Sequence, residues 1–171
     1  YYVDGGSTDG SVMLAAEYEA VEVLQVHSEY PTPGIGRNEG WRSGSSPLVQ
    51  FLDSDTVMDP DWLAKAAAVF DDDTVAAVCG RREEMHPDAS VYNWIADQEW
   101  NGQPGETDAC GGDVLIRRDV LNATNGYDEE LVGGEDPELS QRVRQQGGKI
   151  VQLDEAMTRH DLGMTQVAQY L

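Results

Sequence analysis

The sequence of 171 residues predicts an α/β fold in which a mostly parallel sheet carries helices on both faces. Short apolar runs of strand length alternate with segments that carry helix signals, an order typical of parallel sheets with crossover helices. Aspartate followed by proline, as in Asp59-Pro60 and Asp136-Pro137, marks helix starts because proline fits the first helical position. The length is that of one domain with its own hydrophobic core.

The first 52 residues are expected to hold three strands and two helices. We expect the strands at 1–3, 21–26 and 48–52, and the helices at 12–18 and 35–42. The second of these strands alternates between apolar and polar side chains, which indicates one buried face. Polar loops that contain glycine or proline separate these elements.

The rest of the chain is expected to hold three strands and four helices. The strands are expected at 75–79, 114–116 and 150–153, and the helices at 60–70, 90–100, 137–146 and 165–171. Ser90 is a suitable N-cap for the second of these helices, and Gly147 is a suitable C-cap for the third. The last helix looks incomplete at the end of the chain, and no repeat or linker divides the sequence.

The stretch from Leu48 to Asp55 carries the first functional signal. A mostly apolar run between Pro47 and Asp53 ends in two carboxylates, those of Asp53 and Asp55. In open α/β sheets ligands bind where the parallel strands end, and paired carboxylates there suit a hard divalent cation. A polar exit from the strand without a metal explains both residues equally well, so on this stretch alone both interpretations stay open.

The formal net charge of −21 at pH 7 limits the classes of partner. A chain this acidic repels phosphate backbones, so we expect no nucleic-acid partner. A solvated acidic surface is typical of halophilic proteins, and we expect a salt-loving source. Apolar periodicity persists along the chain and tryptophan and tyrosine are present, which argues against disorder.

The cysteines and the apolar runs bear on the cellular compartment. Cys79 lies in an apolar run and is expected in the core, and Cys79 and Cys110 have no CxxC spacing. A reducing, intracellular setting is therefore the default, and we expect a cytoplasmic protein. No apolar run is long enough to cross a bilayer, so attachment to the inner face of a membrane would need other parts of the protein.

Several short motifs occur in one order along nearly the whole chain. They are VDGGSTDGS (3–11), GRNEG (36–40), FLDSD (51–55), GG (111–112), NGYDE (125–129) and GEDPEL (134–139) with Arg142. In this order they resemble a family 2 glycosyltransferase, which has the Rossmann-like GT-A fold. The resemblance implies a hexosyltransferase that uses a nucleotide-diphosphate-sugar donor with inversion. It also implies a divalent metal, manganese or magnesium, and an acceptor that is a sugar, a lipid-linked glycan or a protein glycan.

On the donor side the resemblance assigns roles to four residues, and a fifth is added as a candidate. Asp4 matches an aspartate that contacts the nucleoside base. Asp53 and Asp55 match the DxD motif, in which the first carboxylate faces the ribose and the second binds the metal. His160 matches a histidine that completes the metal site, so Asp53, Asp55 and His160 are the expected metal ligands. Arg37 is a candidate for binding the diphosphate.

On the acceptor side the resemblance assigns the catalytic base. Glu135-Asp136 matches a motif whose aspartate takes this role, and Gly111-Gly112 matches a loop that lies against the acceptor. A carboxylate can take the proton of the acceptor hydroxyl as the new bond forms, and inversion needs only this one base. The start of a helix should keep Asp136 ionised, with a depressed pKa, because the helix dipole is positive there.

The chain departs from the family in two places. Gly5 stands where the family usually has a second aspartate. The family's first strand, a central one, normally precedes the position of Tyr1, and its loss would leave unpaired backbone groups inside the sheet. We therefore expect 1–171 to be a single GT-A domain that is truncated at both ends. No QxxRW motif is present, so nothing predicts a processive synthase.

Each of these residues also has a purely structural interpretation. Asp136 would be a helix N-cap, His160 an ordinary surface or core histidine, and Asp4 an acceptor for its own turn. Arg37 would form a surface ion pair. We also expect a buried aromatic face on the 90–100 helix, formed by Tyr92, Trp94 and Trp100.

Two rival functions stay open. Residues 51–57 also fit the opening motif of a haloacid-dehalogenase-type phosphatase, with Asp53 as nucleophile and Asp55 as acid/base. That fold needs a later lysine, and Lys65 comes too early and Lys149 too late. A non-catalytic nucleotide-sugar-binding domain would bind the donor with metal and never transfer the sugar, although retention of Asp136 argues against it.

Overall fold

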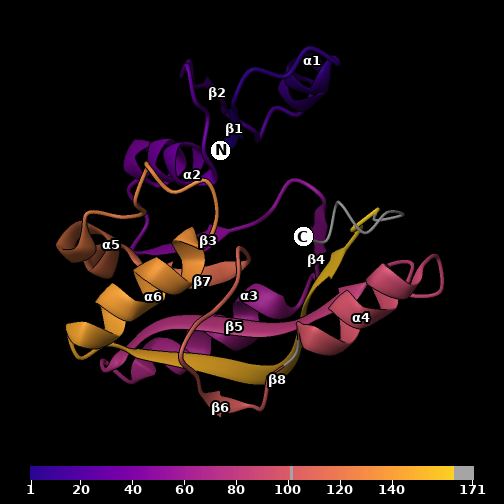
Figure 1. Ribbon diagram of the computed structural model, residues 1–171. Helices are drawn as coiled ribbons and strands as arrows, with labels where there is room; N and C mark the ends of the chain where they lie inside the picture. The colour runs from indigo at the N-terminus through magenta and orange to yellow at the C-terminus, as the bar shows by residue number, and fades with distance from the viewer. Residues whose placement is uncertain (101, 164–171) are drawn as a thin grey trace.

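The computed structural model describes residues 1–100 and 102–163 and has an α/β architecture (Figure 1). The elements follow in the order β1 (Tyr2–Asp4), α1 (Ser11–Ala16), β2 (Val23–Gln25), α2 (Pro33–Ser43), β3 (Leu48–Phe51), β4 (Thr56–Met58), α3 (Trp62–Ala67), the 3₁₀ turn η1 (Ala68–Asp71), β5 (Val75–Glu84), α4 (Val91–Glu99), β6 (Gly105–Glu106), β7 (Val114–Arg117), α5 (Arg118–Thr124), α6 (Glu135–Gln145) and β8 (Lys149–His160). The expected helix at 165–171 lies outside the described residues. In the part of the chain that the structure describes, no helix is both long and apolar enough to span a bilayer.

A six-stranded sheet forms the centre of the molecule, with β3, β7, β5, β8 and β4 side by side and β6 paired to β8. The two longest strands, β5 and β8, are parallel. Strand β3 runs in the same direction as β5, because both are antiparallel to the β7 strand between them. The short strands β4 and β6 are antiparallel to β8. The predicted α/β fold with a mostly parallel sheet is confirmed for β3, β5 and β8, which run in one direction, whereas β7, β4 and β6 run antiparallel to them.

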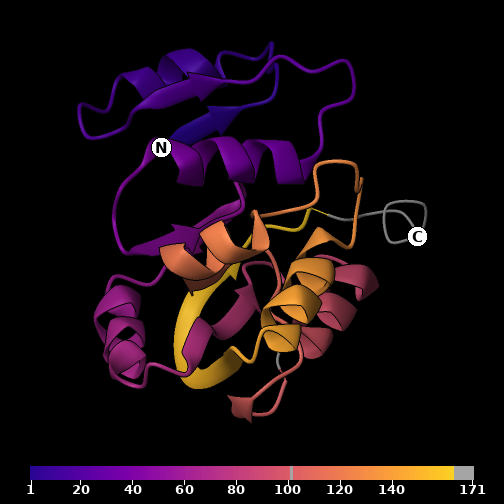
Figure 2. The same cartoon turned by 90° about the vertical axis from the view of Figure 1, so that its left-hand side faces the viewer.

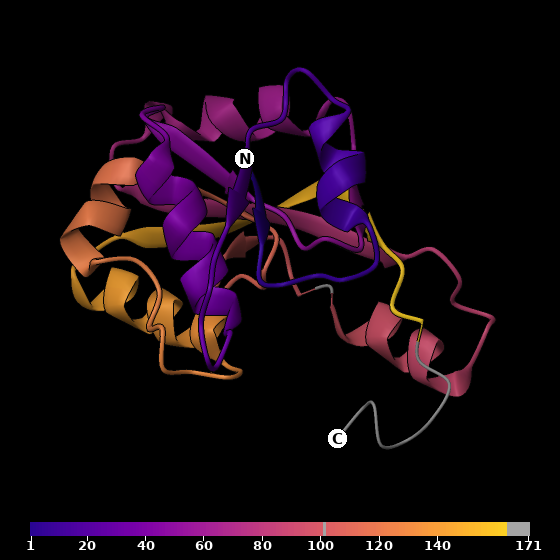
Figure 3. The ribbon, with the colours of Figure 1, turned by 90° about the horizontal axis from the view of Figure 1, so that it is seen from above.

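Helices cover both faces of this sheet, with α3 on one face and α6 on the other (Figure 3). On the α3 face, Trp62 is fully buried and packs on β5 at Gly80. A Cβ atom at Gly80 would lie 2.6 Å from Trp62 Cζ3, so this contact requires glycine. On the α6 face, Leu139 and Val143 are buried toward the strands. The hydrophobic core therefore lies on both sides of β5.

The first two strands form a separate layer with α1, above α2 (Figure 2). Strands β1 and β2 pair in parallel, and Val3 of β1 packs on α2 at Gly40, where a Cβ would lie 3.2 Å from Val3 Cγ2. A groove of about 570 Å³ is lined by both β1 and β3, including Val3, Val49 and Phe51. No strand pairing joins β1 to β3 within residues 1–100 and 102–163. The expected strand upstream of Tyr1 stays a prediction.

The structure extends two strands beyond the apolar runs that predicted them. Strands β5 and β8 continue through polar residues such as Arg82, Glu84 and Thr158 to the functional end of the sheet. The apolar run marks only the part of each strand that is buried among apolar neighbours on both faces. Elements β4, β6 and α5 had no sequence signal of their own, since each is short or mainly polar.

Helix α4 confirms one expectation and corrects another. Ser90 caps the helix as expected, because its Oγ accepts a hydrogen bond from Asn93 N at 3.1 Å. The expected buried aromatic face is wrong for Trp94, which is 55% exposed. Asn93 and Ala96 are buried in its place, and Asn93 Nδ2 donates to Glu84 Oε1 at 3.0 Å. A hydrogen-bonded asparagine can occupy a buried helix face that an apolar pattern does not reveal.

Cys79 in β5 and Cys110 form a disulfide across a separation of 31 residues. Cys79 is buried in the core as expected, but it is not a free thiol. The spacing of the cysteines could not reveal the bond, because the chain returns to β5 only after α4 and β6. The disulfide attaches the segment before β7 to the central strand, and this segment includes Gly111 and Gly112.

Reduction of this disulfide is expected to lower the free energy of unfolding by about 2–4 kcal/mol, because the unfolded chain gains conformational freedom. Urea unfolding with and without dithiothreitol measures the change, and the Cys79→Ser/Cys110→Ser double variant should match the reduced protein and not respond to dithiothreitol. An equal urea midpoint in both conditions would contradict the stabilising role of the bond.

Candidate active site

The chain turns sharply after β3 and presents two aspartates at the end of the sheet. The turn is closed by Thr56, whose N and Oγ1 donate to Asp53 O at 3.3 and 2.8 Å. Asp55 lies at the top of this turn, immediately before β4. The position is the carboxyl end of a strand that runs parallel to β5, which is where ligands bind in α/β sheets.

Strand pairing brings His160 next to Asp55. Thr56 of β4 is the register partner of His160 in β8, and Asp161 N donates to Asp55 O at 2.9 Å. His160 Nε2 consequently lies 3.2 Å from Asp55 Oδ1. The His160 side chain is 7% exposed and the Asp55 side chain 50%, so the pair has a buried and a solvent-facing partner.

Asp53, Asp55 and His160 each offer one ligand atom, and these atoms lie within 4.8 Å of one another. Two carboxylates and an imidazole suit a divalent cation such as Mn²⁺ or Mg²⁺, and one side of the group is open to solvent through Asp55. The structure therefore brings together all three predicted metal ligands, and the donor set fits the metal that the sequence predicts. The ring of Trp100 packs on the His160 ring with centroids 4.9 Å apart.

Arg37 links this group to the predicted base. Its Nη2 lies 2.8 Å from Asp53 Oδ1, and its Nη1 lies 2.5 Å from Glu135 Oε1 and 3.9 Å from Asp136 Oδ1. Burial opposes the charge of Arg37, but the surrounding carboxylates outweigh it and raise the pKa of the guanidinium above its ordinary value. The side chain is only 15% exposed, so the alternative of a surface ion pair is wrong.

Asp136 lies in the first turn of α6 and does not cap it. The helix begins at Glu135, and its N-cap is Gly134, whose φ of 81° favours glycine. The N-cap interpretation of Asp136 is therefore wrong. Its Oδ1 atom is buried without a hydrogen-bond partner among the described residues.

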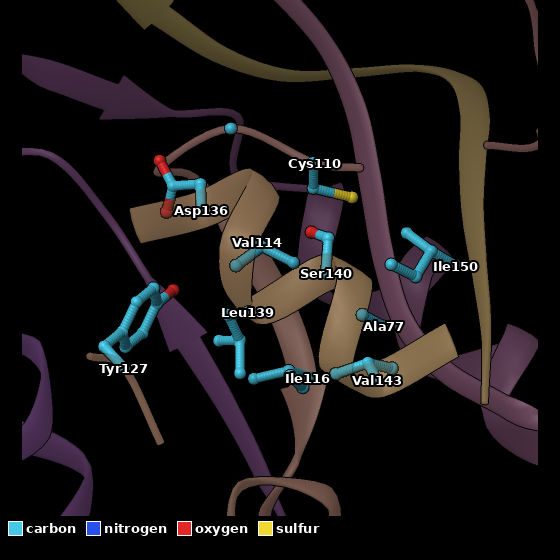
Figure 4. Close-up of a pocket in the computed structure, with 11 residues that line it drawn as sticks. Ala77, Cys110, Val114, Ile116, Tyr127, Asp136, Leu139, Ser140, Val143 and Ile150 are labelled. Atoms are coloured by element: carbon cyan, nitrogen blue, oxygen red, sulfur yellow. The ribbon is translucent and has the colours of Figure 1, made fainter. Parts of the chain in front are cut away.

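The expected depressed pKa of Asp136 is also wrong. Burial raises the pKa of Asp136 to about 6, although Arg37 acts in the opposite direction and Glu135 adds to the rise. The expected depression by the helix dipole is overcome because loss of solvation disfavours the charged form. Asp136 also lines a cavity of about 20 Å³, with the Tyr127 ring at the same side (Figure 4). Buried near Asp136, the Tyr127 hydroxyl has a raised pKa and stays neutral.

The paired glycines lie directly against the charged cluster. A Cβ at Gly112 would lie 2.5 Å from Asp53 Oδ1 and 2.6 Å from Arg37 Nη2. A Cβ at Gly111 would lie 2.9 Å from Arg82 Nη1. Since neither position has room for a side chain, the loop closes one side of the site and leaves its backbone exposed to the charged groups.

Asp4 ends β1, in the separate layer. Its carboxylate accepts hydrogen bonds from Gly6 N at 3.0 Å and Ser7 N at 3.1 Å, so it does order its own turn. Hydrogen bonds from Ser7 and Gly6 lower the pKa of Asp4 below its ordinary value. The carboxylate is thus anionic, and an anionic carboxylate is a stronger hydrogen-bond acceptor than a neutral carboxyl group.

Sequence reasoning missed three residues of this site, Arg82, Trp100 and Asp113. Arg82 Nη2 lies 3.3 Å from Asp53 Oδ2, and its guanidinium lies over the Trp100 ring. Asp113 is completely buried beside them. The only available signal for Asp113 was a charged residue directly before an apolar strand, which acidic surfaces also produce.

The chain is similar in sequence to known protein families and to individual proteins. A sequence profile described as "Glycosyl transferase family 2" matches residues 1–123, and one described as "N-terminal domain of galactosyltransferase" matches 95–165. The chain is 26% identical over 180 residues to the O-antigen chain rhamnosyltransferase RfbN of Salmonella typhimurium, with 95% of this chain and 57% of that protein covered.

Two solved structures share the fold. One is S. aureus TarS 1-349 in complex with UDP-GlcNAc, with a TM-score of 0.71, 20% identity, and 93% of this chain and 48% of that chain covered. The other is the mannosyltransferase PcManGT from Pyrobaculum calidifontis in complex with GDP-Man and Mn²⁺, with a TM-score of 0.69, 20% identity, and coverages of 94% and 46%. The chain spans about half the length of the curated relatives that it matches.

Proposed function

Because the chain belongs to the glycosyl transferase family 2, we propose that it transfers a sugar from a nucleotide-diphosphate-sugar donor to an acceptor hydroxyl, with inversion and with a divalent metal. The observation that carries this proposal is the position of Arg37. Asp53, Asp55 and His160 together are called the metal-type group. The Arg37 guanidinium joins Asp53 of this group to the Glu135-Asp136 pair at distances of 2.5 to 3.9 Å. The groups proposed to bind the donor and the group proposed to accept the proton therefore lie on either side of one cation.

The metal, Mn²⁺ or Mg²⁺, would be held by Asp53, Asp55 and His160. When bound, it supplies Lewis-acid stabilisation of the negative charge that develops on the leaving diphosphate. Asp53 is also proposed to face the ribose, and Asp4 the nucleoside base. Arg37 is proposed to contact the diphosphate, since its guanidinium can exchange a carboxylate partner for a phosphate oxygen.

Asp136 is proposed to be the catalytic base, with Glu135 as its neighbour. Its buried Oδ1 has no hydrogen-bond partner among the described residues and is available to accept a proton. A pKa of about 6 makes this carboxylate more basic than an ordinary aspartate, yet leaves it ionised near neutral pH. One base on the side away from the leaving group is sufficient for inversion. Gly111 and Gly112 are proposed to lie against the acceptor, since their backbone lines the site directly beside the charged cluster.

The finer identity of the substrates is also part of the proposal. TarS and PcManGT were solved with UDP-GlcNAc and with GDP-Man and Mn²⁺, respectively, which supports a nucleotide-sugar donor and a hexosyl group here. We propose a sugar, a lipid-linked glycan or a protein glycan as acceptor, and a salt-rich setting because of the net charge of −21. A cytoplasmic site, at the inner face of a membrane through other parts of the protein, stays a prediction. The Cys79–Cys110 disulfide is a bond that cytosolic reductants tend to open.

The phosphatase alternative finds no support in the structure. It requires a lysine near the nucleophilic aspartate, but Lys65 pairs with Glu155 at 2.7 Å on the surface. Lys149 begins β8, and His160 of the metal-type group ends it, so the two lie at opposite ends of the strand. The cations that contact Asp53 are arginines, Arg37 and Arg82.

Incubation with UDP-, GDP- and dTDP-sugars, a mixture of lipid-linked and free glycan acceptors, and Mn²⁺ tests the proposal. We expect release of a nucleoside diphosphate that depends on acceptor and is abolished by EDTA, and a product whose anomeric configuration, read by NMR, is opposite to that of the donor. A product with retained configuration would contradict the one-base mechanism. Donor binding without any turnover would favour the non-catalytic binding domain.

A further inference from the structure

We infer that Asp113 is a positioning residue that holds the two metal-binding segments together, an inference that rests on the proposed metal-dependent function. Its side chain has an exposed fraction of 0%, which is unusual for a carboxylate. Asp113 is the residue between Gly112 and β7, and it contacts the backbone of Asp53. It offers no atom to that group, so any influence on a metal would act through other residues.

The carboxylate of Asp113 binds both segments that carry the predicted ligands. Its Oδ1 accepts hydrogen bonds from Asp53 N at 2.8 Å and from Thr56 Oγ1 at 3.4 Å. Its Oδ2 accepts a hydrogen bond from Thr158 Oγ1 at 2.6 Å. One side chain thus connects the turn after β3 to strand β8.

The residues that Asp113 contacts lie close in sequence to the predicted metal ligands. Asp53 and Thr56 flank Asp55 on both sides in the turn, so fixing them fixes the backbone that carries the Asp55 carboxylate. Thr158 lies two residues before His160 in β8, and residues at this spacing point to the same face of a strand. The separation between Asp55 and His160 therefore depends on the Asp113 carboxylate as well as on the β4–β8 pairing.

Arg82 pairs with the buried charge of Asp113, and through the ring of Trp100 it connects Asp113 to His160. Its Nε lies 3.4 Å from Asp113 Oδ2, and its Nη2 lies 3.3 Å from Asp53 Oδ2. The guanidinium lies 5.1 Å from the centroid of the Trp100 ring, which packs on His160. Removal of the Asp113 charge would take away one anionic partner of Arg82, and the ion pair between Arg82 and Asp53 would change with it.

A residue that merely stabilises the core would affect unfolding and leave the metal affinity of the folded protein unchanged. Partners that orient metal ligands typically change metal affinity by about 10–100-fold when they are replaced. The two roles are therefore separated by measuring Mn²⁺ binding and thermal stability on the same variants.

The experiment titrates the folded protein with Mn²⁺ alone and follows free Mn²⁺ by electron paramagnetic resonance. Asp113→Asn keeps the size of the side chain and removes its charge, and we expect at least about tenfold weaker Mn²⁺ binding. Thr158→Val removes one hydrogen bond to Asp113 at constant shape, and we expect a smaller loss in the same direction. Thr124→Val is the matched control, because Thr124 is also buried but bonds Val120 O within α5. It should lower Tm and leave Mn²⁺ affinity within about twofold.

Wild-type Mn²⁺ affinity in Asp113→Asn would overturn the inference, whatever the change in Tm. If Asp113→Asn does not fold, Thr158→Val decides, and an affinity equal to that of Thr124→Val would overturn it. Failure of the wild-type protein to bind Mn²⁺ would overturn the metal site itself, and the inference with it. That result is distinguishable from a failure of the inference about Asp113, because it is seen in the wild-type protein.

Discussion

Replacement of Asp136 by asparagine is expected to lower the rate of sugar transfer by about 10²–10⁴-fold, the usual contribution of a general base. Asparagine has nearly the same shape as aspartate and cannot accept the proton of the acceptor hydroxyl. Metal-dependent binding of the nucleotide should stay within about twofold of wild type, because Asp136 is not among the predicted donor ligands. Initial rates with a saturating donor measure the first effect, and calorimetric titration measures the second.

The pH dependence of the transfer rate tests the role of Asp136 independently. With a pKa of about 6 in the folded protein, Asp136 becomes protonated below that pH, so the wild-type rate should fall as the pH decreases through 6. Since this pKa is above the ordinary value of 3.8, ionisation of Asp136 costs stability as the pH rises from about 4 to about 6. Asp136→Asn should therefore be more stable than wild type at neutral pH.

Asp59→Asn is the matched control for this variant. Asp59 also precedes a proline near the start of a helix, but it lies before α3 and accepts a hydrogen bond from Asp61 N. It should transfer sugar at the wild-type rate. A wild-type rate in Asp136→Asn as well would show that the base is another residue.

Replacement of Asp55 by alanine is expected to abolish metal-dependent binding of the donor. The Asp55 side chain is half exposed and contacts His160, so the fold should tolerate its removal. The metal would lose one of two carboxylate ligands, and the diphosphate would lose the cation that binds it. Titration of the variant with a nucleoside diphosphate, with and without Mn²⁺, measures the loss.

Asp161→Ala controls for the change in charge, because Asp161 is an exposed aspartate directly after His160. This variant should bind the nucleotide as wild type does. If Asp55→Ala retained metal-dependent affinity, the DxD motif of this chain would not be a metal site.

The sequence predicted those features that depend on local pattern. The apolar run before Asp53 identified β3, and the motif after it identified two of the three predicted metal ligands. The strand ending at His160 was recognised only in its apolar part, since β8 continues through polar residues. Its pairing with β4 then places His160 next to Asp55, a proximity that the family resemblance implied and that local pattern could not show.

Other features depend on distant contacts and could not be predicted. The partner of Cys79 lies 31 residues away. The pKa of Asp136 depends on burial under the loop and strands around it, whereas the sequence revealed only the helix start. Asp113 resembles the many surface acids of a chain with a net charge of −21, and only its contacts with Asp53 and Thr158 distinguish it.

The central claim is that this site binds a nucleotide sugar through a metal, and calorimetric titration with nucleoside diphosphates tests it most directly. UDP, GDP, dTDP and ADP would be titrated into the protein in molar potassium chloride, with Mn²⁺ and with EDTA. We expect that one diphosphate binds and that its binding requires Mn²⁺. Absence of binding by all of them, in protein that circular dichroism shows to be folded, would contradict the account and leave a similarity of fold alone.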